Sequence, residues 1–157
     1  GVNGCLAQAL ELTEIGQLCQ AGVDDQGRPY GIGRVGTVHC TGMSARTYAA
    51  YVKEKLGASS VRFADGGRPV QKVAVGGGAC GSMVDDALRA GCDTFITADL
   101  KYNQFLDAQA AGLNLLDAGH FPTENVVCAP LVNRLTRAFP DVEVFLSDVH
   151  CEVCQTV

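Results

Sequence analysis

A histidine and a glutamate lie four residues apart in the segment DAGHFPTEN, residues 117–125, between a short apolar run and a longer helix-like segment. An imidazole nitrogen and a carboxylate oxygen are common ligands of Zn, Mn, Fe and Ni. His120 and Glu124 are therefore candidate ligands of a divalent metal, although two ligands alone do not complete a site. Two structural alternatives stay open. For Glu124, the alternative is a position in a first helical turn, where the helix dipole favours a negative charge. For His120, the alternative is a hydrogen-bonded histidine under the sheet edge.

Three further polar residues are expected to lie near this pair. Asp117 precedes His120 by three residues, and we expect it to orient the imidazole as an outer carboxylate or to cap the strand end. Asp99 and Lys101 follow the preceding strand, in TADLKYNQF. Because neighbouring parallel strands end at one edge of a sheet, the sequence predicts one cleft for all of these side chains. The alternative for Asp99 is a cap on the helix that starts near Lys101.

The glycine-rich segment VGGGACGS, residues 75–82, follows a strand and precedes a helix, as phosphate-binding loops do. It lacks the Gly-Lys-Ser/Thr of a P-loop and the acidic partner of a dinucleotide site. The alternative is that these glycines only let the strand and the helix approach closely. The candidate phosphate contacts are Gly76, Gly77, Gly78, Gly81 and Ser82.

The elements that position these residues alternate between strand and helix from residue 70 onward. Such a pattern predicts an α/β fold with a mostly parallel sheet and helices on both faces. Pro122 is expected to keep Phe121 extended and Thr123 to begin the next helix as its N-cap. The expected strands are 72–75, 93–99, 113–119 and 142–147, and the expected helices are 82–91, 101–112 and 125–139.

The first seventy residues are less regular. GCLAQAL predicts one short helix, and RPYGIGRVGTVHC, residues 28–40, predicts a strand with bulges or close backbone contacts at its glycines. Residues 44–57 predict an amphipathic helix with Ser44 as N-cap and Gly57 just past its end.

The composition excludes several classes of protein. The 157 residues, 47% hydrophobic and 18% charged, indicate one globular α/β domain spanning 1–157 rather than a disordered chain. The formal charge of −5 and the lack of a Lys/Arg block argue against nucleic acid as a partner. The apolar runs are too short for a membrane span and no targeting signal is visible, so we expect a cytoplasmic protein without membrane contact.

The eight cysteines are too sparse for a disulfide scaffold. Most are expected to be reduced and buried, as small hydrophobic residues. The C-terminal HCEVC, with His150, Cys151 and Cys154, is the one metal-like or redox-like spacing, but a single C-x-x-C without a second pair is a weak signal.

Several motifs together resemble one known family. The glycine-rich strand end, the T-x-D-x-K-Y block and DAGH-x-x-T-E occur in the order found in the C-terminal half of the Nif-three-like proteins, also called GTP cyclohydrolase I type 2 homologues. GVNG and RPYGIGRVG resemble the middle segment of that family, so the resemblance covers nearly the whole chain. It implies that residues 1–70 are the middle segment and residues 71–157 the βαβα metal-binding half of a longer chain.

The resemblance implies a two-metal site, a hexamer and a hydrolase acting on a nucleotide-like or phosphorylated substrate. His120 and Glu124 match the last two ligands, while a histidine pair and an aspartate would precede this sequence. Asn103 replaces a family histidine, and Cys154 stands where an aromatic residue is usual, which favours packing over zinc binding for the tail. Two other functions stay open: a non-catalytic metal-binding scaffold, and a nucleotide-binding module that uses the glycine loop. By itself this chain is expected to bind metal weakly and to self-associate.

Overall fold

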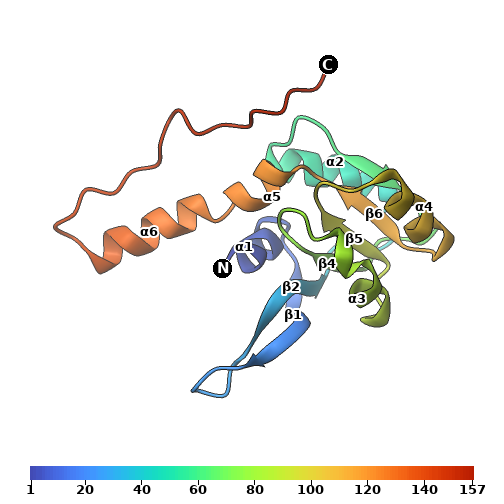
Figure 1. Cartoon of the computed structure of the whole chain (residues 1–157), viewed down its shortest axis with the longest axis horizontal. Helices are drawn as coiled ribbons and strands as arrows, with labels where there is room; N and C mark the ends of the chain where they lie inside the picture. Colours follow the sequence, from blue (N-terminus) through green and yellow to red (C-terminus); the bar gives the residue numbers. More distant parts are fainter.

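Six strands form one sheet in the computed structural model, which describes all 157 residues (Figure 1). The strand order across the sheet is β1-β2-β4-β5-β6-β3. The strands are β1 Thr13–Val23, β2 Pro29–Thr37, β3 Arg62–Ala64, β4 Lys72–Val75, β5 Thr94–Thr97 and β6 Asn114–Asp117.

The centre of the sheet is parallel and its flanks are antiparallel. Strands β4, β5 and β6 run parallel, joined by crossovers through helices, as the alternating pattern predicts. The β1–β2 hairpin adds to one side and the short β3 to the other, each in antiparallel pairing. The α/β class is therefore confirmed, with a mixed sheet around a parallel core. The carboxyl ends of β4, β5 and β6 meet at one edge.

Helices cover both faces of this sheet (Figure 1). Alternate residues along each strand point to opposite faces, which divides the core in two. Val73 and Ile96 pack with α1 and α2, whereas Ala74 and Phe95 pack with α3 and α4. The helices are α1 Val2–Ala9, α2 Ala45–Leu56, the 3₁₀ turn η1 Gly81–Met83, α3 Val84–Arg89, α4 Tyr102–Ala110, α5 His120–Asn125 and α6 Cys128–Ala138.

The local signals of the first seventy residues are confirmed in two places. Ser44 caps α2, accepting a hydrogen bond from the Thr47 amide at 3.1 Å, and Gly57 follows the helix with φ +61°. At Gly31 a Cβ atom would collide with the backbone of Cys19 in the neighbouring strand. The glycines of β2 thus permit close backbone contact, while the register shifts of the hairpin lie between Thr13 and Gly16 and between Gln20 and Gly22 of β1.

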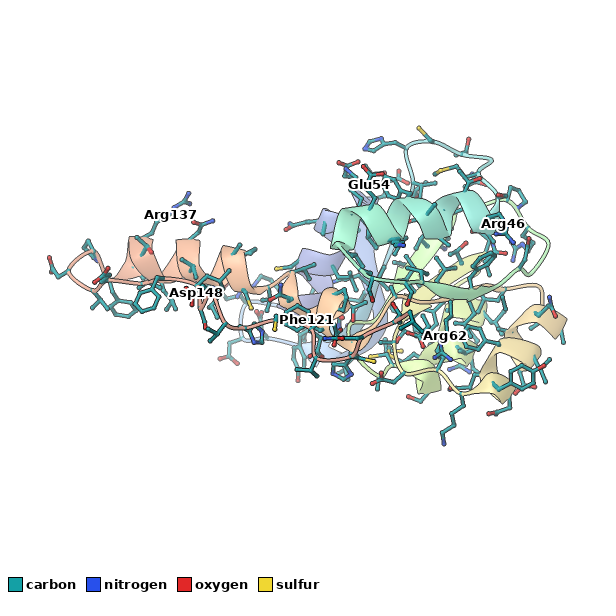
Figure 2. All side chains as sticks on the ribbon, turned by 90° about the horizontal axis from the view of Figure 1, so that it is seen from above. Arg46, Glu54, Arg62, Phe121, Arg137 and Asp148 are labelled. Carbon is teal, nitrogen blue, oxygen red and sulfur yellow. The ribbon has the colours of Figure 1, made fainter.

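The C-terminal region differs from the prediction. The strand expected at 142–147 is wrong, because these residues form no strand and pair with no other segment. The helix expected over 125–139 is present as α6 and starts three residues later, at Cys128, while a separate short helix, α5, precedes it. No residue of α6 is buried. This helix, which carries Arg137, projects away from the sheet, and the tail beyond it runs back past Asp148 toward Phe121 (Figures 1 and 2).

All eight cysteines are free thiols. Cys92 is buried, and its burial raises the pKa of the thiol to about 11. Cys80 and Cys128 are half-buried rather than buried, and Cys151 and Cys154 of the tail are exposed.

None of the helices is long and apolar enough to cross a membrane.

Candidate metal centre

His120 and Glu124 face each other on the short helix α5, which starts directly after β6. Their spacing of four residues places both side chains on one side of the helix. Nε2 of His120 lies 3.4 Å from Oε2 of Glu124, and each side chain is about half exposed, at 51% and 47%. The two candidate ligands therefore turn toward a common point.

That separation is the one expected of two ligands on a single ion. Zinc lies about 2.0–2.1 Å from an imidazole nitrogen and about 2.0–2.2 Å from a carboxylate oxygen. At ligand–metal–ligand angles between square and tetrahedral values, the two donor atoms are then roughly 3.0–3.4 Å apart. The side chains of His120 and Glu124 already meet this condition. A divalent ion fits between them with little movement of either.

Asp99 holds the other nitrogen of the imidazole. Oδ2 of Asp99 lies 2.6 Å from Nδ1 of His120, which leaves Nε2 to face Glu124. A carboxylate bonded to the second nitrogen is the usual outer partner of a metal-binding histidine, because it fixes the tautomer and the ring orientation. The same hydrogen bond raises the pKa of His120 above its ordinary value, and the charge of Glu124 adds to this effect while burial opposes it.

Asp99 does not cap helix α4. The N-cap of that helix is Lys101, whose amide donates a hydrogen bond to Oε1 of Gln104 at 2.8 Å. Asp99 itself has φ +55°, a left-handed conformation that is uncommon outside glycine. Strained backbone of this kind tends to occur where a side chain is held for function. The carboxylate of Asp99 is directed at His120, and its capping alternative is wrong.

Asp117 does not touch the imidazole. It is buried, at 7% exposure, and forms an ion pair with Arg62 of β3. Its Oδ2 accepts a hydrogen bond from the Leu100 amide at 3.0 Å, and its Oδ1 accepts one from the Gly119 amide at 3.1 Å. Of the two roles expected for Asp117, orientation of the imidazole is wrong, and the alternative of a cap at the strand end agrees with these bonds. Asp117 instead joins the backbone next to Asp99 to the backbone next to His120, so it positions both loops.

Lys101 lies apart from this cluster. Its side chain is exposed, forms no ion pair and does not line the cavities beside His120. The prediction of one cleft for all five polar residues therefore holds for Asp99, Asp117 and His120 only, since Glu124 lines the neighbouring cavity on the other side of His120. Arg62, which no sequence pattern singled out, belongs to the cleft instead.

The backbone amides of Gly76, Gly77 and Gly78 are already bonded within the protein. The amide of Gly76 donates to the carbonyl of Ile96, that of Gly77 to Oδ1 of Asn3 at 2.7 Å, and that of Gly78 to Oγ1 of Thr123 at 3.0 Å. A phosphate cradle needs such amides to be free. The geometry therefore favours the alternative role of these glycines, which is close approach.

The geometry of Gly81 and Ser82, the other two predicted phosphate contacts, also favours a packing role over phosphate binding. A Cβ atom at Gly81 would collide with the side chain of Gln104 in α4, so this glycine allows η1 and α4 to pack. Ser82 is exposed and lines a different cavity, beside Cys19 and Met83.

Gly78 is the glycine closest to the metal-binding pair. It has φ +69°, and a Cβ atom there would lie 2.5 Å from Oε1 of Glu124 and 3.2 Å from Nε2 of His120. Only a residue without a side chain leaves this space open. The loop that follows β4 thus passes close to the two candidate ligands and contributes to the site through its shape.

The start of α5 differs from the sequence prediction in a way that brings His120 into the helix. Phe121 is helical rather than extended, and Pro122 is the third residue of α5. Proline is tolerated there because the amides of a first turn lack intrahelical partners. The N-cap is Gly119, with φ +85°, rather than Thr123. The buried Thr123 hydroxyl lies within 2.9 Å of the carbonyls of Gly119 and His120 and accepts from the Gly78 amide.

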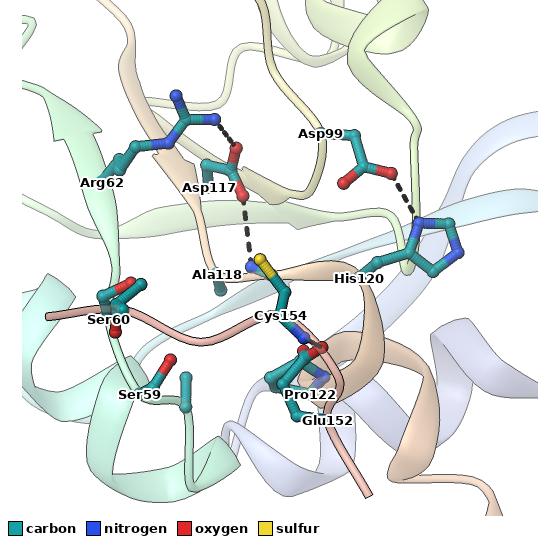
Figure 3. Close-up of a pocket in the computed structure, with 13 residues that line it drawn as sticks. Ser59, Ser60, Arg62, Asp99, Asp117, Ala118, His120, Pro122, Glu152 and Cys154 are labelled. Atoms are coloured by element: carbon teal, nitrogen blue, oxygen red, sulfur yellow. Dashed lines mark hydrogen bonds and ion pairs between the residues drawn. The ribbon is translucent and has the colours of Figure 1, made fainter.

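Cavities open on both sides of His120. One, of about 290 Å³, lies on the side of Asp99 and Arg62 (Figure 3). The other, of about 430 Å³, lies on the side of Glu124 and Phe121. Residues of the C-terminal tail line both, and the ring of His150 lies 4.9 Å from that of Phe121. No group of three or more His, Cys, Asp or Glu side chains has the geometry of a complete metal site.

A family model described as Duf34/NIF3 (NGG1p interacting factor 3) matches residues 1–152 of this chain. The GTP cyclohydrolase 1 type 2 homolog of Bacillus subtilis (strain 168) is 36% identical over 123 residues, which are 75% of this chain and 32% of that protein. The homolog of the same name from Streptomyces coelicolor is 38% identical over 128 residues, which are 79% of this chain and 44% of that protein. The chain thus spans less than half the length of these relatives.

Solved structures show the same fold. A hypothetical protein of Staphylococcus aureus superposes with a TM-score of 0.89 at 25% identity, over 100% of this chain and 64% of that one. A Bacillus cereus protein related to NIF3 also gives a TM-score of 0.89, at 19% identity, over 100% of this chain and 70% of that one. Both matches extend through the C-terminal tail, and both relatives continue beyond the matched region.

Proposed function

Because the chain belongs to the Duf34/NIF3 family, we propose that it forms the part of a divalent-metal-dependent hydrolase that carries His120 and Glu124 as ligands. Zn, Mn, Fe and Ni all accept this donor pair. The full site in this proposal holds two ions and takes its other ligands from chain beyond these 157 residues. The curated relatives carry the name GTP cyclohydrolase 1 type 2 homolog, which directs the proposal toward a nucleotide-like or phosphorylated substrate.

The separation of 3.4 Å between Nε2 of His120 and Oε2 of Glu124, with Asp99 on Nδ1, carries this proposal. Within it, His120 and Glu124 bind the ion, Asp99 fixes the imidazole, and Asp117 fixes the loops that hold Asp99 and His120. When bound, a divalent ion supplies Lewis-acid activation of water and substrate.

Metal titration of the purified chain, followed by elemental analysis, tests the assignment. We expect weak binding of Mn²⁺ or Zn²⁺ that His120→Ala and Glu124→Gln each abolish, because two protein ligands leave most of the coordination shell to water. His39→Ala is the matched control, since His39 lies at a separate cavity beside Tyr48. Tight binding that survives His120→Ala would contradict the proposal.

A longer family chain is then assayed with GTP and simpler phosphoesters to distinguish a hydrolase from a metal-binding scaffold.

Self-association is the second element of the proposal, with a hexamer as the expected assembly. Helix α6 has no buried residue, yet exposed apolar side chains lie along it and at its end, including Leu131 and Phe139 at 49% and 56% exposure. Exposed apolar side chains that gather on one projecting segment are typical of an interaction surface. We expect sedimentation velocity to detect oligomers that Leu131→Glu weakens. A monodisperse monomer would contradict this part.

A further inference from the structure

The C-terminal tail, residues 143–157, returns from the end of α6 to the helix α5 that carries the candidate metal ligands (Figures 1 and 2). Its residues line the cavities on both sides of His120 (Figure 3). They are Glu152, Cys154 and Thr156 on the side of Asp99, and His150, Cys151, Glu152 and Val153 on the side of Glu124. The tail is therefore a shared wall of both cavities.

An aromatic contact anchors the tail to the rest of the protein. The ring of His150 lies 4.9 Å from the ring of Phe121, with an angle of 55° between their planes. Phe121 directly follows His120 on α5, so the anchor and the metal-binding pair share one short helix. Beyond Val144, Glu152 is the only residue of the tail that is not exposed, and it lines both cavities. The contact at Phe121 thus holds the tail against the proposed metal centre.

No hydrogen bond or ion pair supports this anchor. None of residues 143–157 forms either kind of bond with another segment, and the one bond within the tail runs from the Cys154 amide to Oε1 of Glu152. An aromatic pair stabilises a contact only modestly. A segment with few buried contacts opens locally at a small part of the free energy of global unfolding. The tail therefore detaches far more easily than any strand of the sheet.

The docked tail does not cover the metal-binding pair completely. The side chains of His120 and Glu124 are 51% and 47% exposed, so an ion can reach them with the tail in place. A ligand that fills the cavity of about 430 Å³ beside Glu124 lies against the tail as well as against α5. Segments that close over a bound substrate in this way exclude water from the reaction.

We propose that the tail is a strap that closes these two cavities when His150 docks on Phe121 and opens them when it detaches. The exposed stretch between α6 and His150 is the hinge, since only Val144 of residues 140–149 is half-buried. The inference rests on the proposed metal-dependent function, because a strap at this place matters for a reaction only if α5 carries the metal. Opening admits a substrate, and docking encloses it beside the metal-binding pair.

The docked position is tested without any metal, through the histidine ring signals in NMR spectra. We expect nuclear Overhauser contacts between the rings of His150 and Phe121, and a shift of the His150 signals in Phe121→Leu. Phe139→Leu is the matched control, since Phe139 is an exposed phenylalanine at the end of α6 that lines neither cavity. Absence of these contacts, together with His150 signals that Phe121→Leu leaves unchanged, would rule out the strap.

Closure is tested by alkylation of Cys128 with iodoacetamide, followed by peptide mass spectrometry. Cys128 is half-buried and lines the cavity beside Glu124, as His150 does. We expect His150→Ala to speed this alkylation about threefold or more, because the strap loses its aromatic anchor, and to leave that of the exposed Cys40 unchanged. Asp148→Ala is the control, since Asp148 is an exposed residue of the tail that lines neither cavity. Equal rates in His150→Ala and the wild type would show that the tail closes nothing.

Mn²⁺ separates this inference from the proposed metal centre. In the wild type we expect the ion to broaden the ring signals of His120 most strongly and those of His150 next. If His120 is not broadened, the metal assignment fails, whereas the two measurements without metal still decide whether the strap exists. If His120 is broadened and His150 is not, the strap does not dock beside the metal centre.

Discussion

Asp99 and His120 lie 21 positions apart in the chain, yet Oδ2 of Asp99 is 2.6 Å from Nδ1 of His120. Two adjacent parallel strands produce this contact, since β5 ends just before Asp99 and β6 just before His120. Because the hydrogen bond leaves only Nε2 for other partners, it directs the imidazole toward Glu124. The proposed metal centre thus depends on a carboxylate that binds no metal.

Asp99→Asn is expected to lower metal affinity about 10- to 100-fold, since a neutral amide orients and polarises the imidazole less well. Isothermal titration with Mn²⁺ measures the change. Asp85→Asn is the control, because Asp85 is an exposed aspartate on α3 that lines neither of the two cavities beside His120. Equal affinity in Asp99→Asn and the wild type would remove Asp99 from the site.

Gly78→Ala is expected to disturb the metal site more than the fold. The left-handed backbone at Gly78 costs an alanine about 1–2 kcal/mol, and the new methyl group would also push Glu124 away. Gly91→Ala is a close control, since Gly91 has φ +72° and a methyl group there would meet no atom within 4 Å. Chemical denaturation should show similar losses for both variants, and metal titration should show a loss for Gly78→Ala alone. Unchanged metal binding in Gly78→Ala would contradict the described geometry.

Asp117→Ala is expected to reduce the free energy of unfolding by about 2–4 kcal/mol, because the amides of Leu100 and Gly119 lose their acceptor. Urea denaturation measures this loss. Asp107→Ala, at an exposed position of α4, should change stability by less than about 0.5 kcal/mol. Metal affinity should fall as well, since both loops of the site depend on Asp117. A stable Asp117→Ala variant with full metal affinity would show that these bonds are dispensable.

Two tyrosines predict a loss of stability at high pH. Burial raises the pKa of Tyr51 to about 12, assisted by its 2.9 Å hydrogen bond to Glu11, and burial also raises the pKa of Tyr48. The folded state therefore holds these protons more tightly than the unfolded chain. Their contribution to stability is complete below about pH 10 and is lost as the pH rises toward about 12.

Thermal denaturation between pH 9 and pH 12, with Tyr51→Phe for comparison, measures this effect. The variant should lose less stability than the wild type over the upper part of the range, because phenylalanine has no proton to release. Identical pH profiles would show that Tyr51 does not contribute.

The sequence predicts the parallel core well because its signals are local. Ser44 and Gly57 mark the ends of α2, and the β-branched run at 72–75 is a strand with the predicted bounds. In each case, residues close in the chain carry the whole argument. His120 and Glu124 are singled out by their ligand chemistry and by the family resemblance, whereas the helix α5 that carries both was not predicted.

The misses concern partners that are distant in the chain. VEVFLS, residues 142–147, has the alternation of a strand, but a strand needs a neighbour and these residues have none. Arg62 and Asp117 pair across 55 positions, which no local pattern reveals. Phe121 is helical although it precedes a proline, because Pro122 lies in the first turn of α5, where a proline is tolerated. The strand β1, with its polar glutamines, shows no clear apolar alternation.

The most direct test of the central assignment is to add Mn²⁺ in substoichiometric amounts and to follow the ring signals of the three histidines by NMR. We predict that the paramagnetic ion broadens His120 first and His39 least, and that Glu124→Gln removes the effect. Broadening that spares His120, or that persists unchanged in Glu124→Gln, would contradict the metal centre.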